Sequence, residues 1–248
     1  MALILEEGER LDATGFGTVT IIQKPTEFCY GIDAVLLADF ASGKPAKRIA
    51  DLGTGNGILP LLLSYKFPKA RLVGLEIQEE AGSRATRSVA CNQLEDRITI
   101  LHGDVRDGLS LLPPGEFDAV IANPPYNNGF SGIPGENDAL KLARHEITGG
   151  LSDFIRTASG LLRSKGHFYM IHRPSRLVDI FCLCREHRLE PKRIRLIAPR
   201  QGKPPNLVLV HCCKDGGIEL RIEDTLYVHK SEGGYTREIE EIYERKQV

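Results

Sequence analysis

Short apolar runs alternate with amphipathic stretches over most of the chain. The apolar runs have the length of buried parallel strands and lie at 47–52, 71–75, 97–101, 117–122 and 166–171. Helical stretches are predicted between them, at 58–66, 79–92 and 151–163. Strands that alternate with helices form parallel sheets covered by helices on both faces, so we expect a doubly wound α/β domain.

Both ends of the chain depart from this alternation. Residues up to about Gln23 predict a short β-hairpin whose turn is marked by Gly15 and Gly17. Beyond residue 171 we expect, in order, a helix, two antiparallel strands, a last strand and a charged helix, at 174–188, 192–197, 206–213, 218–222 and 236–244. The chain then consists of an N-terminal hairpin extension, residues 1–30, and one domain, residues 31–248.

The composition is that of an ordinary globular protein, with 42% hydrophobic and 26% charged residues. The formal net charge of −1 argues against a uniformly basic nucleic-acid binder. The cysteines, among them Cys182, Cys184, Cys212 and Cys213, do not have the spacing of a zinc site, so we expect free thiols and no metal. A signal peptide and a membrane-spanning run are not recognisable, which favours a cytoplasmic protein.

A glycine-rich turn, Gly53-Thr54-Gly55-Asn56-Gly57, connects the strand at 47–52 to the helix that follows. Its glycines let the backbone approach a ligand closely, and the helix N-terminus supplies N–H donors. The spacing differs from that of the dinucleotide-binding fingerprint. Asp51 lies just before the turn. Its carboxylate would repel a pyrophosphate, but it can accept hydrogen bonds from an ammonium group or a water network.

Carboxylates follow the next two predicted strands. Glu76 ends the strand at 71–75, about 20 residues past the glycines, where an acid can accept hydrogen bonds from both hydroxyls of a ribose. Ile77 would flank an adenine ring. Asp104, after the strand at 97–101, either contacts a cofactor or caps the next helix. Asp33, at the start of an apolar helical stretch, is likewise a helix N-cap or a cofactor contact.

The tetrapeptide Asn123-Pro124-Pro125-Tyr126 follows the apolar run at 117–122. Asn123 carries an amide acceptor, and each proline keeps its carbonyl while it lacks an N–H. Two acceptors can hold the two hydrogens of a planar amino group, and the Tyr126 ring offers a stacking surface of about 1–3 kcal/mol per base. The alternative is a proline-rich turn that closes a strand, with a half-buried tyrosine.

Charge is spread unevenly along the chain. Between residues 163 and 205 there are eleven Lys and Arg against Asp179, Glu186 and Glu190, a balance of +8, so the remainder sums to −9. Such asymmetry indicates a face that meets a polyanion, because phosphate neutralisation releases counterions. The alternative is a solvated helix face with structural ion pairs. The candidates for an RNA contact are Arg173, Arg176, Arg195, Arg200 and Lys203.

The stretch after Tyr126 is polar and rich in glycine over 127–137, the profile of a loop that orders over substrate. It leads to Arg144-His145-Glu146, where His145 is either a phosphate contact or part of a salt-bridged helix start.

Taken together, the motifs resemble the bacterial family that methylates adenine N6 in tRNA1(Val), beside the anticodon. The similarity spans nearly the full length and is carried by Asp33-Ala34-Val35-Leu36-Leu37, Asp51 to Gly57, Glu76-Ile77-Gln78, Asn123 to Tyr126, Arg144-His145-Glu146 and His172-Arg173-Pro174. One departure is Cys29-Tyr30, where relatives usually carry a serine after the aromatic residue.

The resemblance implies a class I methyltransferase fold (Rossmann-like), with a seven-stranded, mostly parallel sheet, and S-adenosyl-L-methionine as cofactor. It implies that Asn123 and Pro124 hold the adenine amino group and that Tyr126 stacks on the base. The implied cofactor contacts are Tyr30, Asp33, Asp51, Gly53, Gly55, Gly57, Glu76, Ile77, Asp104 and Asn123. The implied partner is tRNA, bound by a monomer or weak homodimer, without metal or membrane.

Other functions remain open at this point. Glutamine N5-methyltransferases that act on proteins share Asn-Pro-Pro-Tyr but usually carry an N-terminal helical domain. Methyltransferases of ribosomal RNA guanine N2 tend towards Phe in the fourth position and larger chains. A non-catalytic RNA-binding protein with the same fold would have no reason to keep the acceptor geometry of Asn123.

Overall fold

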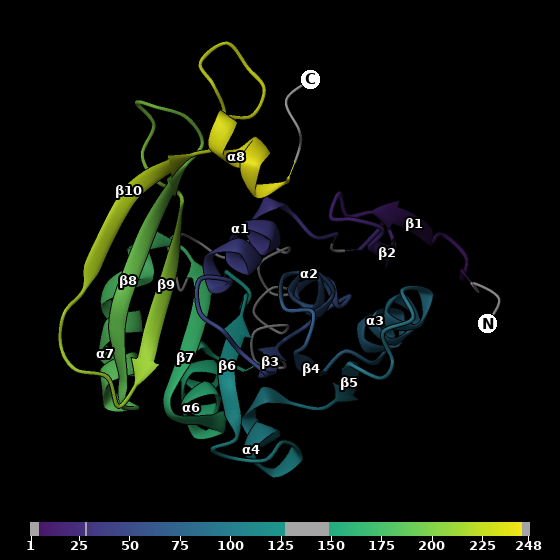
Figure 1. The fold of residues 1–248 in the computed structure, drawn as a ribbon, viewed down its shortest axis with the longest axis horizontal. Helices are drawn as coiled ribbons and strands as arrows, with labels where there is room; N and C mark the ends of the chain where they lie inside the picture. Colours follow the sequence, from purple (N-terminus) through teal and green to yellow (C-terminus); the bar gives the residue numbers. More distant parts are fainter. Residues whose placement is uncertain (1–4, 28, 127–148, 245–248) are drawn as a thin grey trace, which may run out of the picture.

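The computed structural model describes residues 5–27, 29–126 and 149–244. Within them a mixed sheet of eight strands has the order β10-β8-β9-β7-β6-β3-β4-β5 (Figure 1). Its strands are β3 Arg48–Leu52, β4 Arg71–Glu76, β5 Ile98–His102, β6 Phe117–Ala122, β7 Leu162–His172, β8 Leu189–Ala198, β9 Leu207–Lys214 and β10 Arg221–Tyr227. Only β9 runs antiparallel to its neighbours in this sheet, so the expectation of a mostly parallel α/β sheet is confirmed.

Helices cover both faces of the sheet. They are α1 Ile32–Ala41, α2 Ile58–Lys66, α3 Glu79–Cys91, α4 Gly108–Leu111, α6 Leu151–Leu161, α7 Leu177–Glu186 and α8 Arg237–Ile242, with short 3-10 turns η1 Val105–Asp107 and η2 Pro174–Arg176. Ile49 and Ile121 pack with α1 and α2, whereas their strand neighbours Ala50 and Val120 pack with α6 and α7. Successive strand residues point to opposite faces, so strands buried on both faces are continuously apolar. No helix among the described residues is long and apolar enough to cross a membrane.

The described residues contribute eight strands to the sheet, so the expectation of seven is wrong, and the last strand lies further along the chain than expected. The apolar residues Ile218 and Ile222 suggested a strand near 218–222, but they are 82% and 67% exposed. Glu219 has φ 120°, so the chain turns before it joins the sheet. β10 then pairs in parallel with β8 as an edge strand with a single neighbour, which leaves only a weak burial pattern in its sequence.

The first helix begins earlier than its polar pattern indicated. Gly31 is the N-cap of α1, and Asp33 lies in the first turn, where its Oδ1 accepts from Ala34 N. The N-cap interpretation of Asp33 is therefore wrong, because Gly31 holds that position two residues earlier. The loop expected at 127–137 and Arg144-His145-Glu146 lie outside the described residues.

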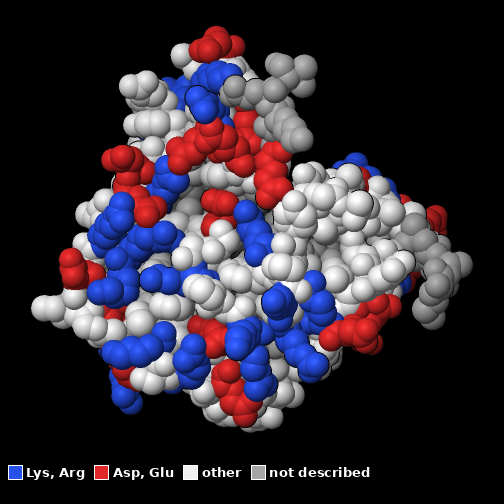
Figure 2. Space-filling view, viewed as in Figure 1, with Lys and Arg blue, Asp and Glu red and all other residues white. Residues whose placement is uncertain are grey.

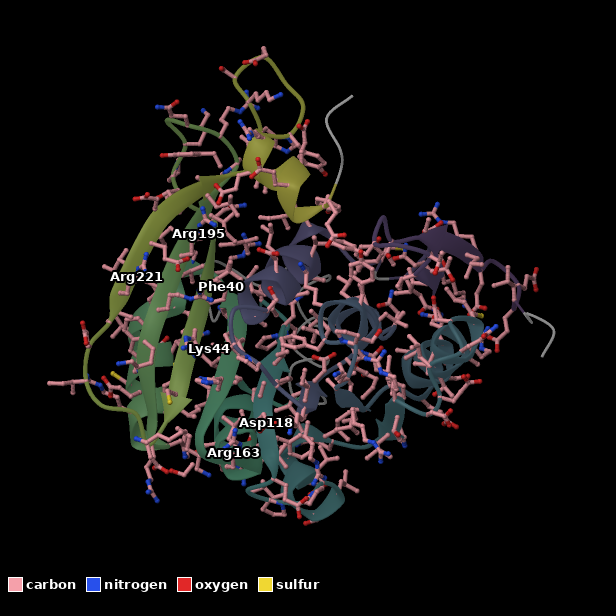
Figure 3. The ribbon with its side chains drawn as sticks, in the orientation of Figure 1. Phe40, Lys44, Asp118, Arg163, Arg195 and Arg221 are labelled. Carbon is pink, nitrogen blue, oxygen red and sulfur yellow. The ribbon has the colours of Figure 1, made fainter. Side chains whose placement is uncertain are left out.

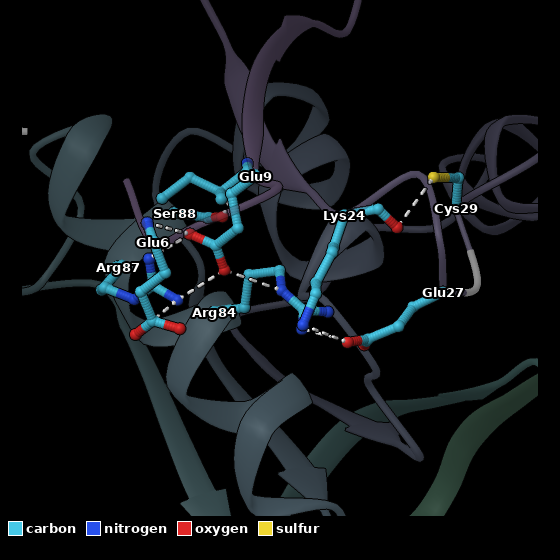
Figure 4. Close-up of polar contacts among 9 residues, drawn as sticks. Glu6, Glu9, Lys24, Glu27, Cys29, Arg84, Arg87 and Ser88 are labelled. Carbon is cyan, nitrogen blue, oxygen red and sulfur yellow. Dashed lines mark hydrogen bonds and ion pairs between the residues drawn. The ribbon is translucent and has the colours of Figure 1, made fainter. Parts of the chain in front are cut away.

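The expected N-terminal hairpin is confirmed as β1 Arg10–Ala13 and β2 Thr20–Gln23. Its attachment to α3 is polar: Ile22 N donates to Ser88 Oγ at 3.0 Å, and Glu9 accepts from both Arg84 and Arg87 (Figure 4). The side chains of Glu9 and Arg84 are only 1% and 5% exposed. The hydrogen bond from Arg87 is the main cause that lowers the pKa of Glu9 to about 2. This buried ion-pair cluster fixes the segment that leads into α1.

Candidate active site

Asp51, Glu76 and Asn123 come from three adjacent parallel strands. Asp51 lies in β3, Glu76 ends β4, and Asn123 directly follows β6. The sheet register pairs Leu52 of β3 with β4 on one side and β6 on the other, so the three strand ends are level. Neighbouring parallel strands open a ligand crevice at their carboxyl ends. The structure therefore brings the main sequence candidates together at one edge of the sheet.

The glycine-rich turn has the backbone that its sequence predicted. Gly53, Gly55 and Gly57 all have positive φ, at 71°, 57° and 84°. Gly55 N donates to Glu76 Oε2 at 2.8 Å, and Gln78 N donates to Glu76 Oε1 at 2.9 Å. A Cβ built on Gly55 would meet nothing within 4 Å. The turn thus leaves open space beside a fixed carboxylate, where a ligand can approach the backbone closely.

Buried polar atoms around this turn have no hydrogen-bond partner among the described residues. They are both carboxylate oxygens of Asp51, Oγ1 of Thr54 and Nδ2 of Asn56. Burial raises the pKa of Asp51 to about 7, and the charge of Glu76 adds to the effect. Unpaired buried polar groups are costly unless a ligand or water satisfies them. Sequence reasoning missed Thr54 and Asn56, although their place inside the glycine motif was a usable signal.

These groups fit S-adenosylmethionine. Asp51 offers an anionic acceptor for its ammonium group, and Glu76 keeps free lone pairs for the hydroxyls of its ribose. Ile77 is half-buried next to Glu76, as a ring contact requires. Asp104 is the N-cap of η1 and accepts from Arg106 N at 2.8 Å, which confirms its capping role. Its contact with a cofactor adenine remains a prediction.

Tyr30 and Asp33 approach the same edge from the N-terminal side. Tyr30 is half-buried, its backbone N donates to Gln23 Oε1 at 3.0 Å, and burial raises the pKa of its phenol. Asp33 Oδ2 lies 3.1 Å from Asn123 Nδ2 and 3.1 Å from the Tyr126 hydroxyl. In this structure Asp33 therefore contacts the Asn-Pro-Pro-Tyr segment. Cofactor contacts by Tyr30 and Asp33 remain predictions.

The Asn-Pro-Pro-Tyr segment closes on itself through its two polar ends. The Tyr126 hydroxyl lies 2.6 Å from Asn123 Oδ1. Burial, followed by the charge of Asp33, raises the pKa of Tyr126 far above its ordinary range, so the phenol stays neutral. Asn123 is thus held at both its amide nitrogen, by Asp33, and its amide oxygen, by Tyr126.

The Tyr126 ring is braced from β7 and the turn after it. The guanidinium of Arg173 lies 5.3 Å from the ring centroid, and the His172 ring meets it edge-on at 5.5 Å. Arg173 N donates to His172 Nδ1 at 2.8 Å, and burial lowers the pKa of His172 to about 4. The neutral ring therefore carries its proton on Nε2. A cavity of about 230 Å³ adjoins this group and is lined by Pro124, Pro125, Gly149, Gly150, Leu151, Ser152, His172, Arg176 and Leu183.

The expected RNA-binding residues separate into two groups. Arg173 and Arg176 lie beside the site. Arg195 lies on β8 (Figure 3), and its guanidinium pairs with Glu238 of α8 at 2.5 Å. Arg200 and Lys203 are exposed and form no ion pair within the described residues. Much of the basic segment is neutralised locally, and acidic side chains lie among the basic ones on the face seen in Figure 2. The paired arginines are Arg163, Arg176, Arg185, Arg188, Arg193 and Arg195.

Comparison with known proteins places this site in a family. The methyltransferase small domain family matches residues 18–178. A tRNA1(Val) (adenine(37)-N6)-methyltransferase of Porphyromonas gingivalis is 32% identical over 92% of this chain and 91% of its own. Its counterpart in Bacteroides thetaiotaomicron is 29% identical over 86% and 87%. A crystal structure described as a predicted O-methyltransferase from Agrobacterium tumefaciens superposes with a TM-score of 0.70 at 28% identity, covering 86% of this chain and 95% of that one.

The fold and the site thus define an S-adenosylmethionine-dependent methyltransferase of class I, with an N-terminal hairpin. Within that class the chain belongs to the tRNA1(Val) adenine-N6 methyltransferase family. The same fold recurs in more distant enzymes, such as a Thermus thermophilus 16S rRNA N2 G1207 methyltransferase, with a TM-score of 0.61 at 20% identity.

Proposed function

We propose that this protein methylates N6 of adenine 37 in tRNA1(Val), the purine that follows the anticodon. The relatives that carry this name match the chain along most of its length. The observation that supports it best is the side-chain amide of Asn123, fixed between Asp33 and Tyr126 at the carboxyl end of β6. A fixed amide oxygen beside the proline carbonyl of residue 124 suits an exocyclic amino group with two hydrogens to donate.

The cofactor supplies a methyl group bound to a sulfonium, which is electrophilic. The protein's part is to place the acceptor nitrogen in line with it. Asn123 Oδ1 and the Pro124 carbonyl accept the two amine hydrogens, and neither proline offers a competing N–H. Acceptors on both hydrogens favour the tetrahedral nitrogen that forms in the transition state over the planar, conjugated amine of the free base. Holding the two reacting groups in the right geometry can by itself accelerate a reaction by many orders of magnitude.

Among the described residues, the site does not present an obvious general base for the amine. Tyr126 is held neutral by burial, and the neutral His172 uses Nδ1 to accept from Arg173 N. An aromatic amine that has just accepted a methyl group carries a positive charge on its nitrogen, and this ammonium cation is a strong acid, so it can release its proton to water. We therefore propose catalysis by orientation, with the polar groups around Tyr126 serving to hold it.

The RNA approaches along the carboxyl edge of the sheet in this proposal. Arg173 lies over the Tyr126 ring and Arg176 lines the cavity beside Pro124 and Pro125. The exposed Arg200 and Lys203 lie in the loop after β8, which ends at the same edge. Cations at these positions can neutralise phosphates around the anticodon loop. We propose a cytoplasmic enzyme that binds tRNA as a monomer or weak homodimer.

Methyl transfer from labelled S-adenosylmethionine tests this function. The substrate is total tRNA from a strain that lacks the gene, and the modified nucleoside is identified by mass spectrometry. We expect N6-methyladenosine confined to one tRNA. Label in protein extract, as methylated glutamine, would instead support the protein N5-methyltransferase alternative. N2-methylguanosine in ribosomal RNA would support the alternative of a ribosomal RNA guanine N2-methyltransferase.

A further inference from the structure

Asp33 contacts both polar ends of the Asn-Pro-Pro-Tyr segment, from an element 90 residues earlier in the chain. Its Oδ1 accepts from Ala34 N at 3.0 Å, and its Oδ2 faces Asn123 Nδ2 and the Tyr126 hydroxyl. We infer that Asp33 is a positioning residue that fixes the Asn123 amide with its oxygen towards the substrate amine. The inference rests on the proposed function in one respect: it assumes that the substrate group is an amine.

The orientation of the side-chain amide decides whether Asn123 can accept a hydrogen bond from the substrate amine. An asparagine side chain presents an acceptor on one edge and two donors on the other, and a rotation of 180° exchanges them. A carboxylate can only accept hydrogen bonds, so Asp33 selects the orientation with Nδ2 towards itself. In the opposite orientation Asn123 would present N–H groups to an amine that needs an acceptor.

Asp33 also offers the Tyr126 hydroxyl a second acceptor. That hydroxyl carries one proton, and it lies 2.6 Å from Asn123 Oδ1 and 3.1 Å from Asp33 Oδ2. When the proton is donated to Asp33, Asn123 Oδ1 has both lone pairs free for the incoming amine. Without substrate, the Tyr126 hydroxyl can donate to Asn123 Oδ1. When substrate binds, the hydroxyl can donate to Asp33 instead, and Asn123 Oδ1 becomes available to the amine.

The start of α1 is built to hold the carboxylate in this place. A Cβ on Gly31 would lie 3.0 Å from Asp33 Oδ1, so the glycine at the N-cap leaves the space that this oxygen occupies. Tyr30, just before it, is tied by its backbone N to Gln23 of the hairpin. Asp33 is therefore anchored on the backbone side, while its second oxygen stays directed at the site.

Asp33→Asn tests the role with little change in volume. We expect the single-turnover rate of methyl transfer to fall about 100-fold, the scale of a small misplacement of a reacting group. The dissociation constant for S-adenosylmethionine, from calorimetry, should stay within about twofold. The matched control is Asp39→Asn on the same helix, where the carboxylate pairs with Lys66 at 2.9 Å, away from the site. Its transfer rate should equal that of the wild type.

A double-mutant cycle separates positioning from a structural role. Asp33→Asn should add almost no further loss to Asn123→Ala, because it acts through the amide that this variant lacks. Gly31→Ala, which displaces the carboxylate without removing it, should lower the rate in the same direction. An equal fold-loss from Asp33→Asn in both backgrounds would overturn the inference, as would a loss of cofactor affinity as large as the loss of rate.

A spectroscopic readout is independent of turnover. The ¹⁵N side-chain amide resonances of Asn123, assigned by their loss in Asn123→Ala, should shift in Asp33→Asn and stay in place in Asp39→Asn. Unchanged resonances in Asp33→Asn would contradict the hydrogen bond. The two proposals fail separately: the nucleoside that the wild type labels tests the proposed function, and the variant-to-wild-type ratio on whichever acceptor is labelled tests Asp33.

Discussion

The guanidinium of Arg173 lies 5.3 Å from the centroid of the Tyr126 ring, so the turn after β7 braces the residue that ends the motif after β6. A cation over an aromatic face contributes about 0.5–2 kcal/mol, depending on how far it is desolvated. One approach to the ring is thereby occupied by the protein, and the sequence alone offered no sign of this pairing.

Arg173→Ala is expected to raise the KM for tRNA about tenfold, because it removes both the brace on Tyr126 and a cation beside the site. Arg173→Lys keeps the charge and loses the flat guanidinium, so its salt dependence should match the wild type while part of the KM defect remains. Steady-state kinetics at two salt concentrations provides the measurement. Wild-type KM values in Arg173→Ala would show that this arginine has no part in substrate binding.

Asn123→Ala should lower kcat by about 10²–10³-fold, the usual cost of removing one hydrogen bond to a reacting group. Cofactor affinity should change little, because the buried groups without partners around the glycine turn lie on Asp51, Thr54 and Asn56. Rapid-quench transfer and calorimetry measure the two quantities on the same preparation. A parallel loss of cofactor affinity would assign Asn123 to the cofactor site instead.

The sequence predicted the parallel core well because its strands are buried on both faces and its turns carry their own signals. Gly53, Gly55 and Gly57 indicate positive φ, and Glu76 and Asn123 lie at the ends of apolar runs that have the length of buried strands. The edge strand β10 was misplaced because its position depends on pairing with β8 through backbone atoms, which leave no mark on side-chain pattern.

Contacts between distant elements were the harder part of the site. For Asp33 the sequence left a helix N-cap and a cofactor contact open, because a polar residue before an apolar helix is only a local signal, whereas its contact with Asn123 spans 90 residues. Arg195 counted as a free cation until the fold placed it beside Glu238. In both cases the residue type indicated a polar contact, and only the tertiary structure showed which residue is the partner.

Asp51 should make stability fall as pH rises. Its pKa in the folded protein is about 7 against an ordinary value of 3.8, so between these values the folded state holds a proton that the unfolded state has released. The free energy of unfolding of the cofactor-free protein should therefore decrease over this window, by up to about 4 kcal/mol. Asp51→Asn should abolish that dependence and bind S-adenosylmethionine more weakly. Denaturant titrations at pH 4 and pH 8, analysed at equal ionic strength, measure the difference.

Glu9 has the opposite dependence, because its pKa is lowered to about 2 by Arg87 and Arg84. Its contribution is complete above the ordinary value of 4.5 and disappears as pH falls through about 2. At neutral pH, Glu9→Gln should cost about 3 kcal/mol, because Arg84 and Arg87 lose their most buried acceptor and keep only the more exposed Glu27 and Glu6. The control is Glu6→Gln, whose side chain is 64% exposed in its pair with Arg87 and should change stability by less than about 1 kcal/mol. Equal changes in the free energy of unfolding in Glu9→Gln and Glu6→Gln would show that burial of the ion-pair cluster does not contribute to stability.

The two ends of β8 provide a matched test of where the RNA lies. Arg200 and Lys203 follow its carboxyl end, at the edge of the sheet that carries Asn123, whereas Arg188 precedes its amino end, at the opposite edge. Arg200→Glu with Lys203→Glu should weaken tRNA binding and reduce the slope of log affinity against log salt by about 1 for each phosphate that the protein no longer neutralises. Arg188→Glu, on an exposed side chain that pairs with Asp215 at 2.7 Å, should leave the affinity and the slope unchanged. Since the strand separates the two positions by roughly 30 Å, an effect at Arg188 alone would move the RNA-binding surface to the amino edge, away from the site that Asn123 defines.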